Sequence, residues 1–396
     1  MLSLDKVFNA QTVLKNIVRE TKLVRAYGIA PDCELYLKPE NLQITGSFKV
    51  RGSAYKIAML TDEEKKKGVI ACSAGNHAQG VALAATKNGI KSLICLPDSA
   101  PISKVEATKG YGAEVCLVEG CYDDAYQKAL ELRDSEGYTF VHPFDDENVI
   151  AGQGTIALEI LNDLDNIAAI VVPIGGGGLI SGIAYTAQQI RPSIKIYGVQ
   201  AAGAPSMYNS VKDGEIERLP SVSTVADGIA VKKPGENTYA LVKEYVDEIA
   251  LVTDDEVSSA ILALIEKQKM IAEGAGAVAV AAVMFGKFNF KNKRVVAVVS
   301  GGNIDVTSLS RVIDRGLLKS GRSSSLLIEL IDKPGQLKEI SRIIADCGGN
   351  VTGVHYEKGD TESVNGCFLR IEMETRDFEH VNLITKTLRD EGFKLV

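Results

Sequence analysis

The stretch AIVVPIGGGGLISGIAY, residues 169–185, decides the fold class of this chain. Its first six residues are apolar and mostly β-branched, which is typical of a strand that is buried on both faces. Four glycines follow at 175–178, and the apolar residues after them have the composition of a buried helix. A strand, a glycine-rich turn and a helix in succession are the repeating unit of a parallel sheet covered by helices.

The same alternation extends outward from this stretch in both directions. Strands are expected at 68–72, 91–96, 114–118, 139–142, 168–174, 195–200 and 294–299. Helices are expected at 76–88, 103–110, 123–137, 154–164 and 179–190. Strands separated by helices indicate βαβ units, so the main body of the chain is predicted to be α/β.

The end of the chain has a different order of elements. Strands are expected at 326–331, 350–357, 365–374 and 393–396, with helices at 334–347 and 378–391. This β-α-β-β-α-β order is the ferredoxin-like split unit. The run RGLLKSGRSSS, residues 315–325, is rich in Ser, Gly and basic residues, as exposed linkers tend to be. We therefore predict a catalytic domain at 1–320, a linker at 321–325 and a small domain at 326–396.

Charge, hydropathy and cysteine content exclude several classes of protein. Lys and Arg number 44 against 51 Asp and Glu, which gives a net charge of −7, so no nucleic-acid partner is expected. The apolar stretches 167–185 and 274–286 are predicted to be buried core, because Pro173 and glycines interrupt the first and the second is short, so no membrane span is expected. The seven cysteines lack metal-binding spacing, which indicates reduced thiols in a cytoplasmic protein.

Three glycine-bearing turns follow strands and are expected at one edge of a sheet. The glycines 175–178 let backbone N–H groups converge on an anion at a helix N-terminus, which predicts a phosphate site, with a tight strand-to-helix turn as the alternative. The turn SAGNH, residues 73–77, suits a carboxylate, with an ordinary helix cap as the alternative. The turn SGGN, residues 300–303, is the third. Open α/β sheets bind ligands at the carboxyl ends of their strands. The glycine run lacks the Gly-Lys-Ser/Thr ending of a nucleotide-binding loop, so a phosphorylated cofactor is favoured.

Two other segments match the dinucleotide-binding pattern G-x-G-x-x-A. They are GQGTIA at 152–157 and GAGAVA at 274–279. The pattern requires a strand immediately before it, whereas these segments follow a polar loop and a helical run. A nicotinamide cofactor is therefore not expected.

One lysine has neighbours that set it apart from the surface lysines. Lys49 lies in GSFKVRG, residues 46–52, between an aromatic residue and a nearby glycine. Most lysines are exposed, so this position alone means little. An amine can form a Schiff base and accept a proton where burial and neighbouring charge lower its pKa.

Taken together, five motifs resemble, in order and separation, the pyridoxal-phosphate enzymes of the tryptophan-synthase β type, and among them the threonine dehydratases. The motifs are GSFKVRG (46–52), SAGNHAQG (73–80), GGGG (175–178), EGAGA (273–277) and SGGN (300–303). The resemblance implies the type II fold of pyridoxal-phosphate enzymes, with two parallel-sheet α/β subdomains, the smaller one inserted at about 50–150. The tail, with IDKPGQL at 331–337, resembles an ACT regulatory domain of ferredoxin-like fold.

The resemblance also implies a role for individual residues. Lys49 would hold the cofactor and remove the Cα proton of the substrate, and Phe48 would pack near the ring. The other cofactor-binding residues would be Asn76 at the phenolic oxygen, Gly175, Gly176, Gly177 and Gly178 at the phosphate, and Ser300 at the pyridine nitrogen. The substrate would meet Ser73, Ala74, Gly75 and Asn76 at its carboxylate, and Glu273 near its amino or hydroxyl group. An effector would meet Asp332, Pro334, Gly335 and Asn350.

The activity that the resemblance implies is the dehydration and deamination of L-threonine to 2-oxobutanoate and ammonia. An amino-acid effector, isoleucine or valine, would act through the ACT domain, and a homodimer or homotetramer is expected. Serine racemases of this family carry a serine where this chain has Ala74, so racemisation is disfavoured. Their divalent-metal ligands would fall near Gln200 and Ser206, which are weaker ligands, so the metal content is left undecided.

Two alternatives stay open on the sequence. The first is a serine dehydratase or a β-replacing enzyme of the cysteine-synthase kind, because threonine and serine differ by one methyl group, worth only about 1–3 kcal/mol in a pocket. The second is a catalytically inactive amino-acid sensor, against which the presence of Lys49 argues. The sequence also leaves open whether the role is isoleucine biosynthesis or threonine breakdown, and whether a monovalent cation binds.

Overall fold

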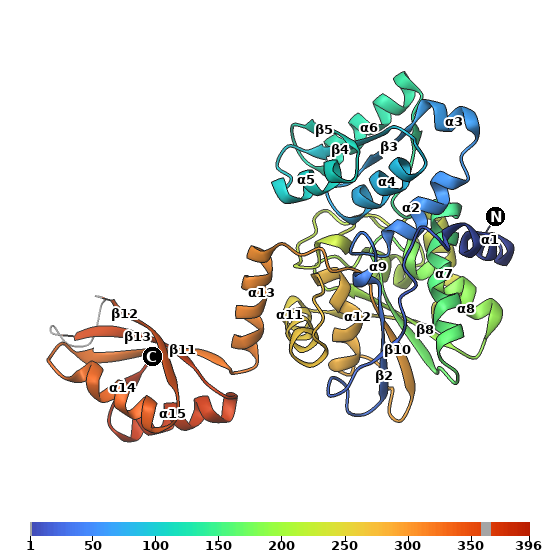
Figure 1. Ribbon diagram of the computed structural model, residues 1–396. Helices are drawn as coiled ribbons and strands as arrows, with labels where there is room; N and C mark the ends of the chain where they lie inside the picture. The colour runs from blue at the N-terminus through green and yellow to red at the C-terminus, as the bar shows by residue number, and fades with distance from the viewer. Residues whose placement is uncertain (1, 358–365) are drawn as a thin grey trace. The chain divides into compact units, whose positions relative to one another are not determined.

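A computed structural model describes residues 2–357 and 366–396 (Figure 1). The chain divides into two compact units, Met1–Val306 and Thr307–Val396. Each unit has a hydrophobic core of its own. Within the described residues, no helix combines the length and the apolar character that crossing a membrane requires. All seven cysteines carry free thiols.

The larger sheet of the first unit has six strands in the order β1-β2-β10-β7-β8-β9. All neighbours are parallel except β1 and β2. Strand β10 lies between β2 and β7, so Arg294 pairs with Glu34 although 260 residues separate them. The strands are β1 (Val24–Arg25), β2 (Glu34–Pro39), β7 (Ala169–Pro173), β8 (Lys195–Ala201), β9 (Glu248–Val252) and β10 (Arg294–Val299).

Helices cover this sheet, and α8 and α12 pack directly against its strands. The helix α12 is almost entirely buried, because Ala, Gly and Val on all its sides meet other elements. The helices of this part are α1 (Leu4–Leu14), α2 (Lys49–Ala58), α7 (Glu147–Asp163), α8 (Gly178–Ile190), α9 (Ser206–Asp213), α10 (Glu236–Tyr245), α11 (Asp254–Ala263) and α12 (Gly274–Met284), with short helical turns η1 (Glu40–Leu42), η2 (Asp227–Ile229) and η3 (Leu264–Gln268).

The smaller sheet has four parallel strands in the order β5-β4-β3-β6, and its residues lie in sequence between β2 and β7. The helices α4, α5 and α6 pack against it (Figure 1). Two parallel sheets covered by helices confirm the predicted fold class of the body. The elements are β3 (Val69–Cys72), β4 (Ser92–Pro97), β5 (Glu114–Val118), β6 (Thr139–Phe140), α3 (Asp62–Lys67), α4 (Asn76–Lys87), α5 (Ile102–Gly110) and α6 (Tyr122–Glu136).

The helix expected at 154–164 begins seven residues earlier, at Glu147. The Asp146 side chain caps it by accepting hydrogen bonds from the N–H groups of Asn148 and Val149. The polar sequence before 154, which resembled a loop, is therefore the capped first turn of a helix.

The glycines of the two G-x-G-x-x-A segments serve helix packing. A Cβ atom at Gly152 would lie 2.7 Å from the Arg51 carbonyl oxygen, and one at Gly276 would lie 2.1 Å from the Gly301 oxygen. Glycine at these positions lets α7 approach α2, and lets α12 approach the end of β10. Neither segment follows a strand, as their sequence context predicted.

The second unit is a four-stranded antiparallel sheet in the order β12-β13-β11-β14, with α14 and α15 packed on it. Its βαββαβ order confirms the ferredoxin-like prediction. Residue 365, expected in the third strand, lies outside the described residues. The elements are α13 (Val306–Lys319), β11 (Ser323–Ile331), α14 (Gln336–Asp346), β12 (Asn350–Glu357), β13 (Gly366–Glu374), α15 (Phe378–Asp390) and β14 (Lys394–Leu395).

The linker predicted at 321–325 is mostly regular structure. Helix α13 extends to Lys319, and Ser323, Ser324 and Ser325 pair with β13 as the first residues of β11. The compact second unit accordingly starts at Thr307, before the predicted boundary. The Ser, Gly and basic residues predicted an exposed linker, but β13 offers Ser323, Ser324 and Ser325 hydrogen-bond partners.

Candidate active site

The loop that carries Lys49 is bonded to the turn after β10. Phe48 N–H donates to the Ser300 carbonyl oxygen over 3.1 Å, and Gly302 N–H donates to the Gly46 oxygen over 2.9 Å. Ser47 and Gly301 form an isolated antiparallel bridge. These contacts join two of the sequence motifs side by side.

A buried ion cluster fixes the helix α2 that Lys49 begins. The Arg51 guanidinium binds Glu40 over 2.8 Å and Glu159 over 2.6 Å, and Lys38 also pairs with Glu159. Arg51 is 1% exposed and Glu40 is fully buried, so neither charge is shared with water. The two cations and two carboxylates balance, and they tie α2 to β2, η1 and α7.

The amine of Lys49 lies deep in the site, although the residue as a whole is partly exposed. Its Nζ donates to the Pro143 carbonyl oxygen over 2.9 Å and lies 5.3 Å from the centre of the Phe48 ring. Burial lowers the pKa of Lys49 to about 8, while the nearby Glu273 carboxylate acts in the opposite direction. A fraction of this amine is therefore uncharged and nucleophilic near neutral pH.

Glu273 stands at the N-terminus of α12 and is only 5% exposed. Its Oε1 accepts a hydrogen bond from Asn76 Nδ2 over 2.6 Å. Burial and the charge of Asp227 raise the pKa of Glu273 to about 7, against the Asn76 hydrogen bond and the charges of Lys104 and Lys49. This carboxyl group can hold or release a proton in the neutral range.

The four glycines form the turn between β7 and α8. Gly177 has φ +98° and no side chain caps the first turn of α8. Thr238 Oγ1 donates to the Gly176 oxygen over 2.6 Å, and a Cβ atom at Gly176 would lie 2.5 Å from the Phe144 ring. Close packing therefore requires glycine at 176 and 178, which face Phe144, and at 177, which faces Thr238. The N-terminus of α8 retains the dipole and N–H groups that suit an anion.

The remaining predicted residues also lie at these strand ends. Ser300 is 3% exposed, and its Oγ donates to the Ala275 carbonyl oxygen over 3.2 Å. Ser73 Oγ accepts from Gly75 N–H over 3.2 Å, and no side chain caps α4. Ala74 packs against the core of the smaller sheet. Hydrogen bonds thus connect the predicted residues to one another. The Lys49 loop is bonded to Ser300, Ser300 is bonded to the first turn of α12, and Asn76 is bonded to Glu273.

Several residues near the site carried no strong sequence signal. His142 Nδ1 accepts from the N–H groups of Phe144 and Asp145, and burial lowers the pKa of His142 to about 4. His77 contacts the Val141 oxygen, and burial followed by the charge of Lys49 lowers the pKa of His77 to about 3. Both imidazoles stay neutral at pH 7. The strand-end rule applied to β6 could have indicated residues 142–145. Asn303 lay within the SGGN turn without a role of its own, and nothing in the sequence indicated Thr238.

The structure separates the four predicted effector residues. Asp332, Pro334 and Gly335 form the turn between β11 and α14, where Asp332 is hydrogen-bonded to Tyr356. Asn350 begins β12 at the other end of the sheet and donates to Glu374. At about 3.3 Å per residue, eight strand residues put some 25 Å between them, so they do not form one pocket within this chain.

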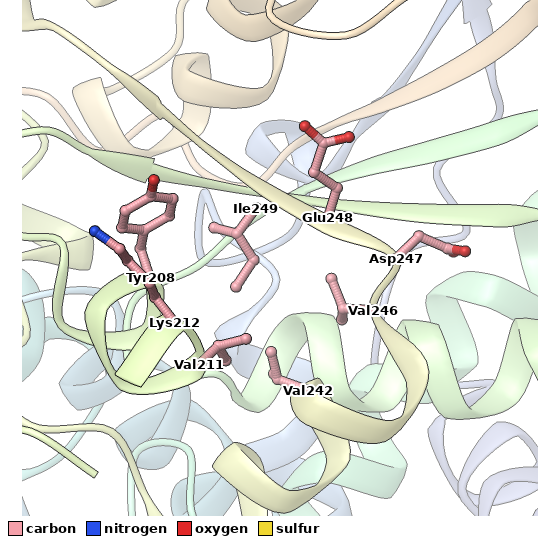
Figure 2. A pocket seen from close by; sticks show the side chains of 8 residues that line it. All are labelled: Tyr208, Val211, Lys212, Val242, Val246, Asp247, Glu248 and Ile249. Carbon is pink, nitrogen blue, oxygen red and sulfur yellow. The ribbon is translucent and has the colours of Figure 1, made fainter. Parts of the chain in front are cut away.

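A separate cavity of about 180 Å³ lies between α9, α10 and the edge strand β9, and none of the predicted site residues lines it. Figure 2 shows Ile249 pointing toward the helices while the Glu248 carboxylate turns away. In the part of the chain that the structure describes, no group of three or more His, Cys, Asp and Glu side chains is arranged to hold a metal ion.

Comparisons with known proteins give the family of this chain. The family model for pyridoxal-phosphate dependent enzymes matches residues 14–301. An L-threonine ammonia-lyase of Thermotoga maritima is 48% identical over 100% of this chain and 99% of that protein. The processed threonine deaminase isoform 2 of Solanum lycopersicum is 38% identical, with a TM-score of 0.74 over 79% of this chain and 94% of that one. Maize serine racemase is 34% identical, with a TM-score of 0.75 over 80% of this chain and 98% of that one.

The residues present fit pyridoxal phosphate. An amine whose pKa burial has lowered to about 8 suits the aldehyde, and the uncapped N-terminus of α8 suits the phosphate. The buried Ser300 hydroxyl, which donates to the Ala275 carbonyl oxygen here, can rotate to donate its hydrogen to a ring nitrogen. The motifs, the two-sheet fold and the relatives agree, and the chain belongs to the family of pyridoxal-phosphate-dependent enzymes.

Proposed function

We propose that this protein is an L-threonine ammonia-lyase, which converts L-threonine to 2-oxobutanoate and ammonia. The observation that carries the proposal is the buried Lys49 amine, with its lowered pKa, beside Glu273, which has a raised pKa. The similarity to the Thermotoga maritima enzyme over the full chain supports threonine as the substrate.

Bound pyridoxal phosphate supplies the electron sink for the charge left at Cα when a proton is removed. Lys49 would hold the cofactor through its amine and, once that amine is free, would accept the Cα proton of the substrate. The N-terminus of α8 would hold the phosphate, Ser300 would bind the pyridine nitrogen, and Phe48 would pack near the ring.

The substrate carboxylate is held at the uncapped N-terminus of α4 by the turn Ser73, Ala74, Gly75 and Asn76. Glu273 lies where it can give a proton to the departing β-hydroxyl group, which leaves as water. Hydrolysis of the released enamine takes up one water and yields 2-oxobutanoate and ammonia. Water lost and water gained therefore balance over the reaction.

The test is a visible absorbance spectrum of the purified protein, before and after L-threonine is added, with 2-oxobutanoate assayed in parallel. We expect a cofactor band that shifts on addition, with product formation, and loss of both in Lys49→Ala. The exposed Lys66→Ala is the matched control and should behave as the parent protein. Cofactor uptake without product from threonine would remove this activity and leave the family assignment intact.

Serine is the second candidate substrate, because serine racemase of maize shares this fold at 34% identity. Ala74 stands where racemases of this type carry a serine, so dehydration of L-serine is favoured over racemisation. The ratio of kcat/KM for threonine and serine decides between the two substrates. A ratio below one would make the protein a serine dehydratase.

We further propose that the second unit is an ACT domain that binds isoleucine or valine and regulates the catalytic unit. Its βαββαβ fold and the full-length match to the Thermotoga maritima protein support this. Because Asp332 and Asn350 lie at opposite ends of one sheet, a site built from both would need two copies of the chain, which suits a homodimer or homotetramer. The seven free thiols suit a reducing cytoplasm.

A further inference from the structure

A series of hydrogen bonds connects the Thr45 carbonyl oxygen, through the side chains of Asn303 and Asn76, to the Glu273 carboxylate. Asn303 Nδ2 donates to the Thr45 carbonyl oxygen over 2.7 Å and to Asn76 Oδ1 over 2.8 Å. Asn76 Nδ2 in turn donates to Glu273 Oε1 over 2.6 Å. The series joins the ends of β10 and β3 to the start of α12.

The Thr45 carbonyl determines the direction of every hydrogen bond in this series. A carbonyl oxygen only accepts, so the Asn303 atom that faces it must be the amide nitrogen. That nitrogen uses its second hydrogen on Asn76, so the Asn76 atom it meets must be the oxygen. The NH2 group of Asn76 is therefore turned toward Glu273. The two ends of an amide are similar in shape, and only this series distinguishes them.

Gly46 makes room for the amide of Asn303. A Cβ atom at Gly46 would lie 2.2 Å from Asn303 Oδ1, and Gly46 also has φ +69°. The Asn303 amide therefore fits only beside a glycine at position 46. Gly46 is the first residue of the Lys49 motif, and Asn303 is the last residue of the SGGN motif. Neither residue has a part in the roles assigned above.

We propose that Asn303 is a positioning residue that holds Asn76 with its NH2 group facing Glu273 and the cofactor. The proposal deepens the proposed function, because it rests on Asn76 meeting the cofactor's phenolic oxygen. An oxygen of that kind is a hydrogen-bond acceptor, and a reversed Asn76 amide would present it with another acceptor. Asn303 thereby makes Asn76 a donor at the point where a donor is required.

The variants that test this are Asn303→Ala, Asn303→Asp and Asn76→Ala, with the double variant Asn76→Ala/Asn303→Ala. Aspartate keeps the shape of Asn303 but cannot donate to Thr45 or to Asn76, so it tests orientation even if alanine perturbs folding. Asn289→Ala, at an exposed residue in the same unit, is the control. The urea midpoint of each apoprotein separates loss of folding from loss of positioning.

The measurements are the dissociation constant of pyridoxal phosphate and the wavelength and pH titration of the visible band, all without substrate. We expect Asn303→Ala and Asn303→Asp to weaken cofactor affinity roughly tenfold to a hundredfold, the range for a hydrogen bond to a charged group, and to shift the band. In the Asn76→Ala background, loss of Asn303 should add nothing further.

Additive effects of the two alanine substitutions would overturn the proposal, as would a parent-like affinity and band in Asn303→Asp. A parent-like Asn76→Ala would also overturn it. None of these readouts depends on threonine. A protein that binds the cofactor without converting threonine would therefore contradict the proposed function while this test still gives its own answer.

Discussion

Two titratable side chains in the site are buried without a full ionic partner, and their pKa values move toward each other. Burial lowers the pKa of Lys49 to about 8 and raises that of Glu273 to about 7. Each shift means that the folded state disfavours the charged form. The site therefore costs stability, as reactive sites often do.

Replacing Lys49 with methionine should stabilise the apoprotein at pH 7. The unfolded state holds the lysine proton up to about pH 10.5 and the folded state only to about pH 8, so the parent gains stability as pH rises between these values. Lys49→Met should be more stable below pH 8 by about 3 kcal/mol and should lose that rise. Urea unfolding from pH 7 to 10.5 checks this, with the exposed Lys66→Met as control. A variant less stable than the parent at pH 7 would contradict it.

Lys104 and Asp227 should shift the ionisation of Glu273 in opposite directions. They form an ion pair of 2.8 Å, but Asp227 raises the pKa of Glu273 and Lys104 lowers it. Asp227→Asn should move the Glu273 ionisation to lower pH, and Lys104→Met should move it to higher pH. The measurement is the pH profile of kcat/KM for threonine, following the ionisation that disappears in Glu273→Gln. If both variants moved the Glu273 ionisation in the same direction, the shift would come from breaking the ion pair and not from the charge of either residue.

At the scale of helices and strands, glycines decide how closely neighbouring elements approach. Gly152 of α7 faces Gly52 of α2, and Gly182 of α8 faces Gly154 of α7. These contacts bring α2, and with it Lys49, against α7. The glycine spacing that resembled a dinucleotide motif is a consequence of this packing.

Gly152→Ala should destabilise the catalytic unit by about 1–3 kcal/mol, because the added methyl group has no space beside the Arg51 carbonyl and Gly52. Gly110→Ala, at the end of α5 with no neighbour within 4 Å of the added atom, is the matched control and should be neutral or slightly stabilising. Urea midpoints compare the two. Equal midpoints would show that α7 can move away from α2 at little cost.

The sequence predicted the elements whose apolar pattern is uninterrupted. Strands β3 and β7 lie within a residue or two of the expected ranges. Strand β2 was not predicted, because it contains Lys38, which is buried beside its ion-pair partner Glu159, 121 residues away. Periodicity cannot reveal a charge that is neutralised by a distant part of the chain.

The same reasoning explains which site residues could be predicted. Strand ends drew attention to Ser73, Gly175 and Ser300, because glycine-bearing turns are visible in the sequence. Asn303 is positioned by its hydrogen bonds to Thr45 and Asn76, which are 258 and 227 residues away in the sequence. Such partners appear only once the strand order is known.

At the scale of the whole molecule, two units with separate cores imply that the catalytic unit can work alone. The hydrophobic cluster around Ile328 and Ile371 belongs entirely to the second unit. Deleting residues 323–396 should leave threonine turnover near that of the full chain and abolish the response to isoleucine or valine. Initial rates with and without each amino acid measure this, with full-length Asp332→Ala as the milder variant. A truncated enzyme that still responds to isoleucine would place the effector site elsewhere.

The central position of β10 in the larger sheet bears on how the protein is made. Strand β2 leaves the ribosome early, yet its parallel neighbour follows 260 residues later. At roughly 5–20 residues per second, the nascent chain carries an unpaired β2 edge for some tens of seconds. The bridge between Ser47 and Gly301 forms later still, so the Lys49 loop is completed only when nearly all of the catalytic unit has been synthesised. A nascent chain thus has no finished cofactor site to load, and exposed strand edges make this interval the one in which chaperones matter most.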